Sequence, residues 1–174
     1  KKSTLAWAFF RVTRMDEAMT RVRGLYDEHG PALLRYLRRM TGRAETAEDL
    51  LHETFVQAMR GLRQLEQAAS PKAWLFSIAR HLGINAVQRR RLTTPLSEGI
   101  AAGQVTEEDP RLERMREAIA GLPETQREAL QLRLRDELSY DEIANVLGIP
   151  VGTVRSRLHN AVQGLRERLK THED

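Results

Sequence analysis

The sequence feature that most restricts the fold is a pair of helical segments near the C-terminus, separated by a three-residue break. Ser139 and Glu142 have the S-x-x-E spacing of a capping box, which predicts a helix beginning at Tyr140. Residues 148–150 (Gly-Ile-Pro) end this helix, because glycine accepts the left-handed conformation of a helix C-terminus and proline cannot continue the hydrogen-bond ladder. A second helix then begins at about Val151. Its apolar side carries residues at helical spacing: Val154, Leu158, Ala161, Leu165 and Leu169.

The other side of this second helix carries side chains suited to DNA. Arginine reaches guanine edges or phosphates, asparagine suits adenine, and serine and threonine suit either kind of base edge. The alternative is an αα-hairpin whose basic face only meets solvent. The small residues Gly152 and Ser156 would let the helix approach a groove closely, and they favour a DNA-binding helix-turn-helix. The predicted DNA-binding residues of this helix are Thr153, Arg155, Ser156, Arg157, His159 and Asn160.

The rest of the chain is also predicted to be helical. No segment has the alternating β-branched pattern of a strand, while apolar residues recur at helical spacing through most of the sequence. The Gly30-Pro31 pair is expected to separate the first two helices. The predicted helices upstream of residue 139 span about 16–29, 31–40, 44–62, 71–91, 111–121 and 123–135. The predicted fold class is all-α, with two small helical domains joined by a flexible linker and the helix-turn-helix in the second domain.

The linker is predicted where helical periodicity stops, between residues 93 and 110. This stretch holds a Thr-Thr-Pro sequence, two glycines and an acidic run, which are typical of a solvated connection. The expected organisation is an N-terminal extension over residues 1–15, expected to be disordered, a first domain over 16–92, the linker, and a second domain over 111–174.

Composition and charge exclude several function classes. The 28 Lys and Arg against 24 Asp and Glu give a net charge of +4, so any basic surface must come from how the charges are distributed. The chain has no cysteine, which excludes disulfides and thiolate metal sites and suits a reducing cytoplasm. No apolar run approaches the roughly 18 residues of a membrane span. There is no glycine-rich phosphate loop and the five histidines are scattered, so we expect no enzyme activity, no metal and no cofactor.

Four passages together resemble the bacterial sigma factors of the extracytoplasmic-function (ECF) class, the two-domain kind. They are AEDLLHETFVQA (47–58), PKAWLFSIARHLGINAVQRRR (71–91), LPETQREALQLRL (122–134) and LSYDEIANVLGIPVGTVRSRL (138–158). Each passage alone is only a modest indication of the family, but all four in this order and spacing form a specific one. The resemblance implies a first domain that binds polymerase and opens the −10 promoter element, and a second that recognises the −35 element. The implied partners are the RNA polymerase core, through the clamp helices of its largest subunit, promoter DNA and an anti-sigma factor, with no membrane insertion.

The resemblance also assigns residues in the first domain. On the 44–62 helix, polar side chains fall outward of the stripe formed by Leu51, Phe55 and Met59, and such an acidic face suits basic helices of a partner. An ordinary solvated face is the alternative from residue pattern alone. The predicted polymerase-binding residues are Glu48, Asp49, His52, Glu53 and Gln57.

The predicted −10 contacts come from a loop and the helix after it. Residues 64–70 resemble the loop that captures a base flipped from the non-template strand, which requires polar groups to hydrogen-bond the extruded base. The consecutive arginines 89–91 suit phosphates without sequence preference, and Trp74 is assigned to the core. The predicted −10 residues are Gln64, Gln67, Ser70, Arg80, His81, Asn85, Gln88, Arg89 and Arg90.

Two rival functions remain open on sequence grounds. An autonomous helix-turn-helix regulator usually dimerises to read a palindrome, and it would leave the first domain unexplained. An all-helical protein-interaction adaptor would use its basic C-terminal helix only for solvation.

Overall fold

The computed structural model describes the backbone of residues 2–93 and 109–170, and the side chains of 17–92, 109 and 111–170. Over these residues the secondary structure is helical without strands, which confirms the all-α prediction. The chain divides into two compact units, Lys1–Ser97 and Glu98–Asp174. Most of the predicted linker, residues 94–108, lies outside the described residues.

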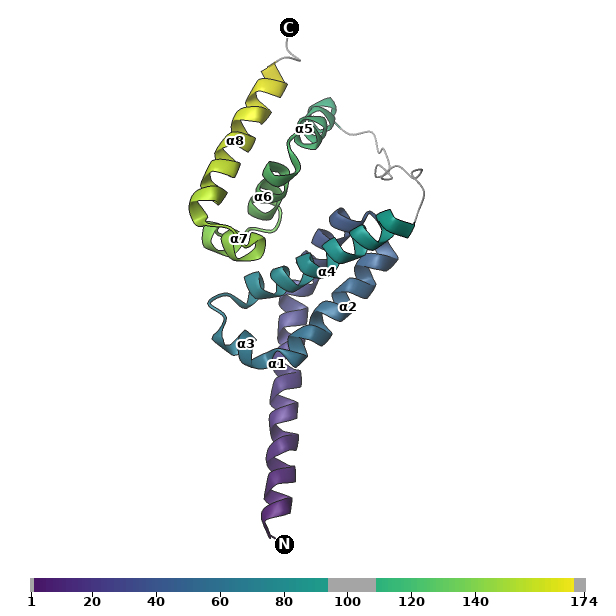
Figure 1. The fold of residues 1–174 in the computed structure, drawn as a ribbon, viewed down its shortest axis with the longest axis vertical. Helices are drawn as coiled ribbons and strands as arrows, with labels where there is room; N and C mark the ends of the chain where they lie inside the picture. Colours follow the sequence, from purple (N-terminus) through teal and green to yellow (C-terminus); the bar gives the residue numbers. More distant parts are fainter. Residues whose placement is uncertain (1, 94–108, 171–174) are drawn as a thin grey trace. The chain divides into compact units, whose positions relative to one another are not determined.

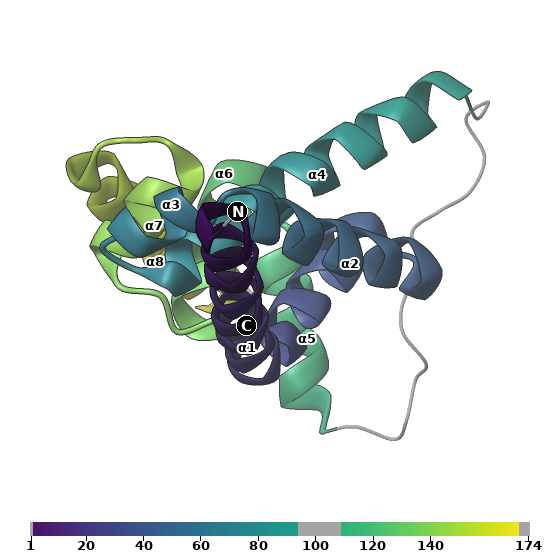
Figure 2. The ribbon, with the colours of Figure 1, turned by 90° about the horizontal axis from the view of Figure 1, so that it is seen from below.

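Unit 1 contains helices α1 (Lys2–Thr41), α2 (Ala44–Arg60), α3 (Leu62–Gln67) and α4 (Pro71–Thr93) (Figure 1). Helices α1, α2 and α4 pack against one another, and the short helix α3 contacts α2 and α4. Figure 2, which looks nearly along α1, shows α2 and α4 running out from it side by side. Their shared core is formed by large apolar side chains from all three long helices: Leu33, Leu37, Leu51, Phe55, Leu75 and Phe76.

Helix α1 is continuous through Pro31, so the predicted break at Gly30-Pro31 is wrong. Proline inside a helix removes one hydrogen bond and costs about 3 kcal/mol or more. Packing on both sides of the proline outweighs this cost, because Val22 before it and Leu33 after it are buried in the same core. Gly30 itself is buried against the ring of Tyr26.

Helix α1 also begins at Lys2, which differs from the disordered extension expected over residues 1–15. No glycine or proline occurs between residues 2 and 23, so this stretch contains no residue that ends a helix. The sequence of residues 2–23 is therefore compatible with a helix that continues upstream of the domain core.

Helix α3 occupies part of the segment predicted to be a loop. Leu65 is 1% exposed and anchors this single helical turn, while its backbone N–H donates to the carbonyl oxygen of Gly61 at 3.0 Å. The irregular part of the connection is thereby reduced to residues 68–70. Gln64 and Gln67, predicted as loop residues, lie on α3 instead.

Unit 2 contains α5 (Pro110–Ala120), α6 (Glu124–Leu134), α7 (Tyr140–Leu147) and α8 (Val151–Lys170), and α8 contacts the other three. The capping box is confirmed: the Glu142 N–H donates to Ser139 Oγ at 3.2 Å, and the Ser139 N–H donates to Glu142 Oε2 at 2.7 Å. Gly148 ends α7 with φ 65°, the left-handed conformation that glycine accepts without strain. The predicted helix-turn-helix is therefore present.

Candidate nucleic-acid and polymerase interfaces

The first half of α8 separates a buried side from a polar side. Val154, Leu158 and Ala161 are at most 6% exposed and pack into unit 2. The predicted DNA-binding residues lie on the other side: Arg155, Ser156, His159 and Asn160 are exposed, and Thr153 and Arg157 are half-buried. The hydroxyl of Ser156 donates to the Thr153 carbonyl oxygen at 3.0 Å, so its lone pairs remain to accept a hydrogen bond from a base or a neighbouring side chain.

The start of α8 has room for close approach. A methyl group at Gly152 would meet no atom within 4 Å, so the surface there is open. Before α7, the guanidinium of Arg133 donates to the Leu138 carbonyl oxygen at 3.0 Å and lies 5.7 Å from the centre of the Tyr140 ring. Arg133 therefore ties α6 to the entry of the helix-turn-helix. Sequence reasoning missed this residue, because the bond spans the irregular segment between the two helices.

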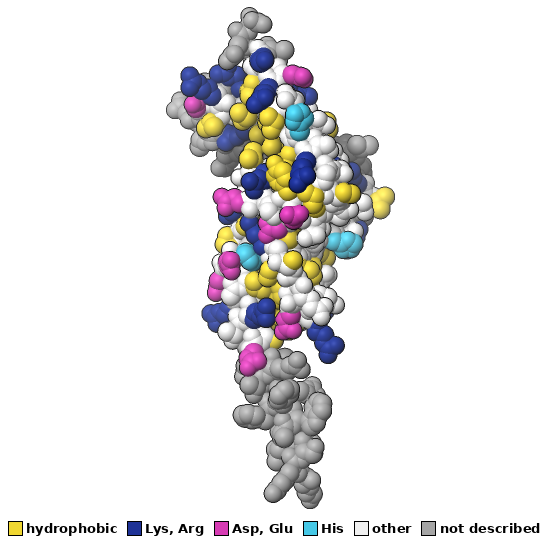
Figure 3. Space-filling model, turned by 90° about the vertical axis from the view of Figure 1, so that its left-hand side faces the viewer, with side chains coloured by type: hydrophobic (Ala, Val, Ile, Leu, Met, Phe, Trp, Pro, Cys, Tyr) yellow, Lys and Arg dark blue, Asp and Glu magenta, His cyan; other side chains and the backbone are white. Residues whose placement is uncertain are grey.

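The charge of unit 2 gathers on α8. This helix contains one acidic residue, Glu167, and five basic residues, at positions 155, 157, 166, 168 and 170. Figure 3 shows one face of the molecule, on which Lys and Arg side chains lie among apolar side chains. Arg168 Nη2 donates to the Gly121 carbonyl oxygen at 2.6 Å, so this arginine contributes to holding the fold. Arg155 and Arg166 are exposed and present their charge to solvent.

In unit 1, the second half of α4 carries a polar row at helical spacing. His81 Nε2 lies 3.1 Å from Asn85 Nδ2, and Arg89 Nε donates to the Asn85 carbonyl oxygen at 3.3 Å. Asn85, Gln88, Arg89 and Leu92 line a shallow depression. Arg80 and Arg90 are half-buried beside this row. The predicted −10 residues of α4 therefore all lie between Arg80 and Arg90 of this helix.

The other predicted −10 residues lie before α4. Gln64 and Gln67 are exposed and three residues apart on α3, so they share one side of that helix. Ser70 Oγ accepts a hydrogen bond from the Ala73 N–H at 3.1 Å and caps the start of α4. The oxygen of Ser70 thus has a structural role in addition to any contact with a base.

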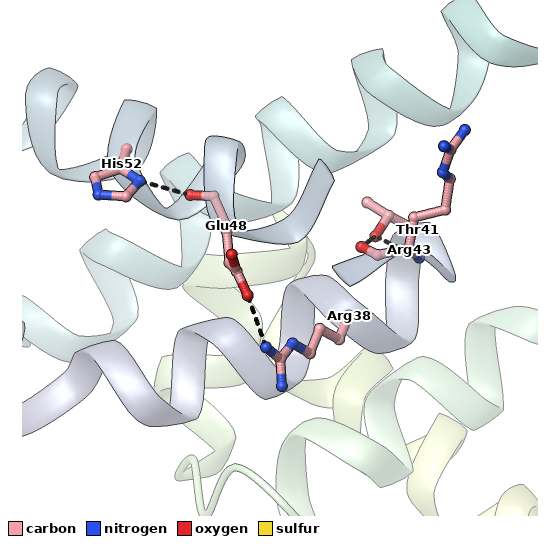
Figure 4. Close-up of polar contacts among 5 residues, drawn as sticks. All are labelled: Arg38, Thr41, Arg43, Glu48 and His52. Carbon is pink, nitrogen blue, oxygen red and sulfur yellow. Dashed lines mark hydrogen bonds and ion pairs between the residues drawn. The ribbon is translucent and has the colours of Figure 1, made fainter. Parts of the chain in front are cut away.

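The outward face of α2 is partly engaged within the fold. Glu48 Oε1 pairs with Arg38 Nη2 of α1 at 2.8 Å, and His52 Nδ1 lies 3.0 Å from the Glu48 carbonyl oxygen (Figure 4). Gln57 Nε2 donates to Glu53 Oε1 at 3.2 Å, and both side chains are half-buried. Asp49 is exposed and projects its carboxylate from this face.

Two apolar residues join the α2 face, and the sequence pattern did not predict them there. Val56 and Met59 are each 39% exposed, and they follow His52 at offsets of four and seven residues. The prediction that Met59 points into the core is wrong. The buried side of α2 is formed by other residues, including Leu50, Leu51 and Phe55, and Met59 lies outside it. A mixed acidic and apolar face suits protein contact better than a purely solvated one.

The described residues offer neither a metal site nor a membrane span. In the part of the chain that the structure describes, no three His, Cys, Asp or Glu side chains converge as metal ligands do. Among the described helices, none combines the length and apolar character needed to cross a membrane.

Comparisons with known proteins agree with this architecture. Residues 25–93 match the family described as Sigma-70 region 2, and residues 112–165 match Sigma-70, region 4. The RNA polymerase sigma factor YlaC of Bacillus subtilis is 33% identical over 164 residues, covering 88% of this chain and 95% of YlaC. The ECF RNA polymerase sigma factor SigL of Mycobacterium tuberculosis (strain H37Rv) is 36% identical over 153 residues, covering 83% and 86%.

A solved structure extends the agreement to three dimensions. The sigma factor RpoE from Bartonella quintana, in complex with the anti-sigma factor NepR, has a TM-score of 0.67 and 27% identity, covering 85% of this chain and 96% of that one. Together with these matches, the two helical units, of which the second carries a helix-turn-helix, identify a two-domain transcription factor of the sigma type. The chain belongs to the ECF sigma factors, and the resemblance carried by the four sequence passages is confirmed.

Proposed function

We propose that this sigma factor directs core RNA polymerase to specific promoters, with unit 2 recognising the −35 element and unit 1 binding polymerase and opening the −10 element. The observation that carries the proposal is the polar side of α8, where Arg155, Ser156 and Asn160 are exposed above a fully buried Val154. A helix held by its buried side can present its other side to a major groove without a change in its backbone.

Unit 1 is proposed to act on both protein and DNA. The exposed carboxylate of Asp49, with Val56 and Met59 beside it, would dock on basic helices of the polymerase clamp. The polar row of α4 and the exposed amides of α3 would hold the −10 strand, with the arginines of α4 on phosphates. An unpaired base would be hydrogen-bonded by Gln64 and Gln67, since amide side chains supply both donors and acceptors.

An anti-sigma factor is proposed to restrain the protein. The support is the relative RpoE, whose structure was solved with the anti-sigma factor NepR. Such a partner would cover the faces that polymerase and promoter need. We further propose that the protein has no enzyme activity of its own and works in the cytoplasm, where polymerase and the chromosome lie.

Reconstituted transcription tests this function. Purified core polymerase with the full chain is expected to give run-off transcripts from a selected promoter, while core alone does not. A matched pair of variants separates the two parts of the proposal: Asn160→Ala should alter promoter choice, and Asp49→Arg should lower all transcription. If the full chain gives no promoter-specific transcript with the core enzyme of its own host, the sigma function is refuted.

A further inference from the structure

Gly61 and Trp74 meet at the corner where α2 passes into α3. A methyl group at Gly61 would lie 3.0 Å from Trp74 Cζ2 and 3.1 Å from Trp74 Cη2, closer than ordinary van der Waals contact. Gly61 is half-buried and so is Trp74. The far edge of the indole ring therefore rests directly on the glycine backbone.

The glycine at this corner is explained by the contact and not by backbone freedom. Gly61 has φ −100° and ψ 28°, which L-residues with a side chain also adopt. What only glycine provides here is the absence of a Cβ beneath the tryptophan ring.

The same corner determines where α3 lies. Gly61 is at once the residue that ends α2 and the one that precedes α3, and its carbonyl oxygen accepts from the Leu65 N–H at 3.0 Å. Leu65 is 1% exposed, and Glu66 lies 4.0 Å from Arg21 of α1. That ion pair is exposed and weak, so the packing at Gly61 and Leu65 dominates the placement of α3.

Trp74 links this corner to the start of α4. Trp74 lies in the first turn of that helix, and its backbone N–H donates to the Ser70 carbonyl oxygen at 3.0 Å. The ring reaches back from α4 to Gly61, across the segment 68–70 that joins the two helices. One side chain therefore spans both ends of the segment that carries Gln64, Gln67 and Ser70.

We propose that Trp74 is a positioning residue for promoter opening. By packing on Gly61 it fixes the position of α3 relative to the start of α4, so that Gln64 and Gln67 can receive an unpaired base. This inference rests on the proposed function of unit 1. It differs from assigning Trp74 to the core alone, because the predicted consequence is a change in base preference. It also differs from direct stacking of Trp74 on DNA, because Gly61, which bears no side chain, should matter equally.

The test uses holoenzyme on a set of promoters that differ at one −10 base, with permanganate reactivity of unpaired thymines as the measure of opening. Gly61→Ala is expected to reduce the preference for the best base on the order of tenfold, the discrimination that one good base contact provides. Trp74→Phe, which removes the ring edge above Gly61, should have a similar effect. The double variant should recover part of the preference, because the added methyl group occupies the space that the smaller ring leaves.

Gly24→Ala is the matched control. A methyl group at Gly24 would meet nothing within 4 Å, and this residue lies in α1, so base preference should not change. Circular dichroism and core binding should remain at the wild-type level in all variants that support the proposal. If Gly61→Ala loses helical content, Trp74→Phe, which leaves the backbone at residue 61 unchanged, carries the comparison instead.

The outcomes distinguish the inference from the function beneath it. If Gly61→Ala leaves base preference unchanged while Gln64→Ala alters it, the positioning role is refuted and the function of unit 1 stands. If Trp74→Phe abolishes opening and Gly61→Ala has no effect, Trp74 contacts DNA directly and the inference is again wrong. If the wild-type holoenzyme opens no promoter, the proposed function itself fails.

Discussion

The capping box of α7 allows a prediction whose size follows from the structure. Ser139→Ala removes the oxygen that accepts the Glu142 N–H and leaves that donor without its side-chain partner. Loss of such an N-cap costs about 1 kcal/mol, within a range of about 0.5–2. Helix α7 has only eight residues, and four of them are buried in unit 2, so it depends strongly on its cap and its packing.

The thermal consequence should be confined to unit 2. For a domain of about 60–100 residues, 1 kcal/mol lowers Tm by roughly 4–8 °C. Differential scanning calorimetry of the full chain is expected to show this decrease in the transition of unit 2 and no change in that of unit 1. Transcription below the transition temperature should change little, because Ser139 lies outside the proposed base-contacting side of α8.

Two further variants make the prediction refutable. Ser139→Asp keeps an acceptor at the cap and should retain most of the stability. Ser77→Ala is the matched control, because Ser77 donates to the Ala73 carbonyl oxygen inside α4 of unit 1 and should not affect unit 2. Equal destabilisation by Ser139→Ala and Ser139→Asp would show that the cap hydrogen bond is not the source of the effect.

Further predictions concern the proposed contacts. Asp49→Arg combined with Glu53→Arg should abolish co-purification with core polymerase while circular dichroism stays unchanged; normal yield, or loss of helical signal, would contradict a docking face. Arg155→Ala and Asn160→Ala should each cost about 1–3 kcal/mol in promoter discrimination at one base of the −35 element, and unchanged promoter choice in transcription assays would refute the assignment. Gly152→Ala should preserve the thermal stability of unit 2, since the methyl group meets open space, yet lower −35-dependent transcription; wild-type transcription would show that α8 does not approach a groove there.

Local chemistry made the helix-turn-helix predictable from sequence. The cap joins Ser139 to a residue three positions away, and Gly148 ends the helix through its own backbone conformation, so both signals lie within a few residues. The polar side of α8 followed from helical periodicity in the same way. The −35 candidates could therefore be identified from the residue pattern alone.

Features that depend on residues distant in the chain could not be predicted. The continuity of α1 through Pro31 depends on packing against α2 and α4, and Arg168 reaches the carbonyl oxygen of Gly121, 47 residues away. The pairing of Glu48 with Arg38 likewise requires two helices to be placed side by side. Periodicity gives the side of a helix on which a residue lies, but not which of its polar groups are already engaged within the fold.

The central claim, that promoter selection requires this chain and polymerase together, is tested most directly by measuring duplex binding with and without core enzyme. Opening the −10 strand costs free energy that the free chain must supply alone, and each unit offers only a small contact. Electrophoretic mobility shifts at matched salt are expected to show weak, salt-sensitive and largely nonspecific binding by the isolated chain, and selective binding by the holoenzyme. Tight sequence-specific binding by the chain alone would contradict the account and favour an autonomous regulator.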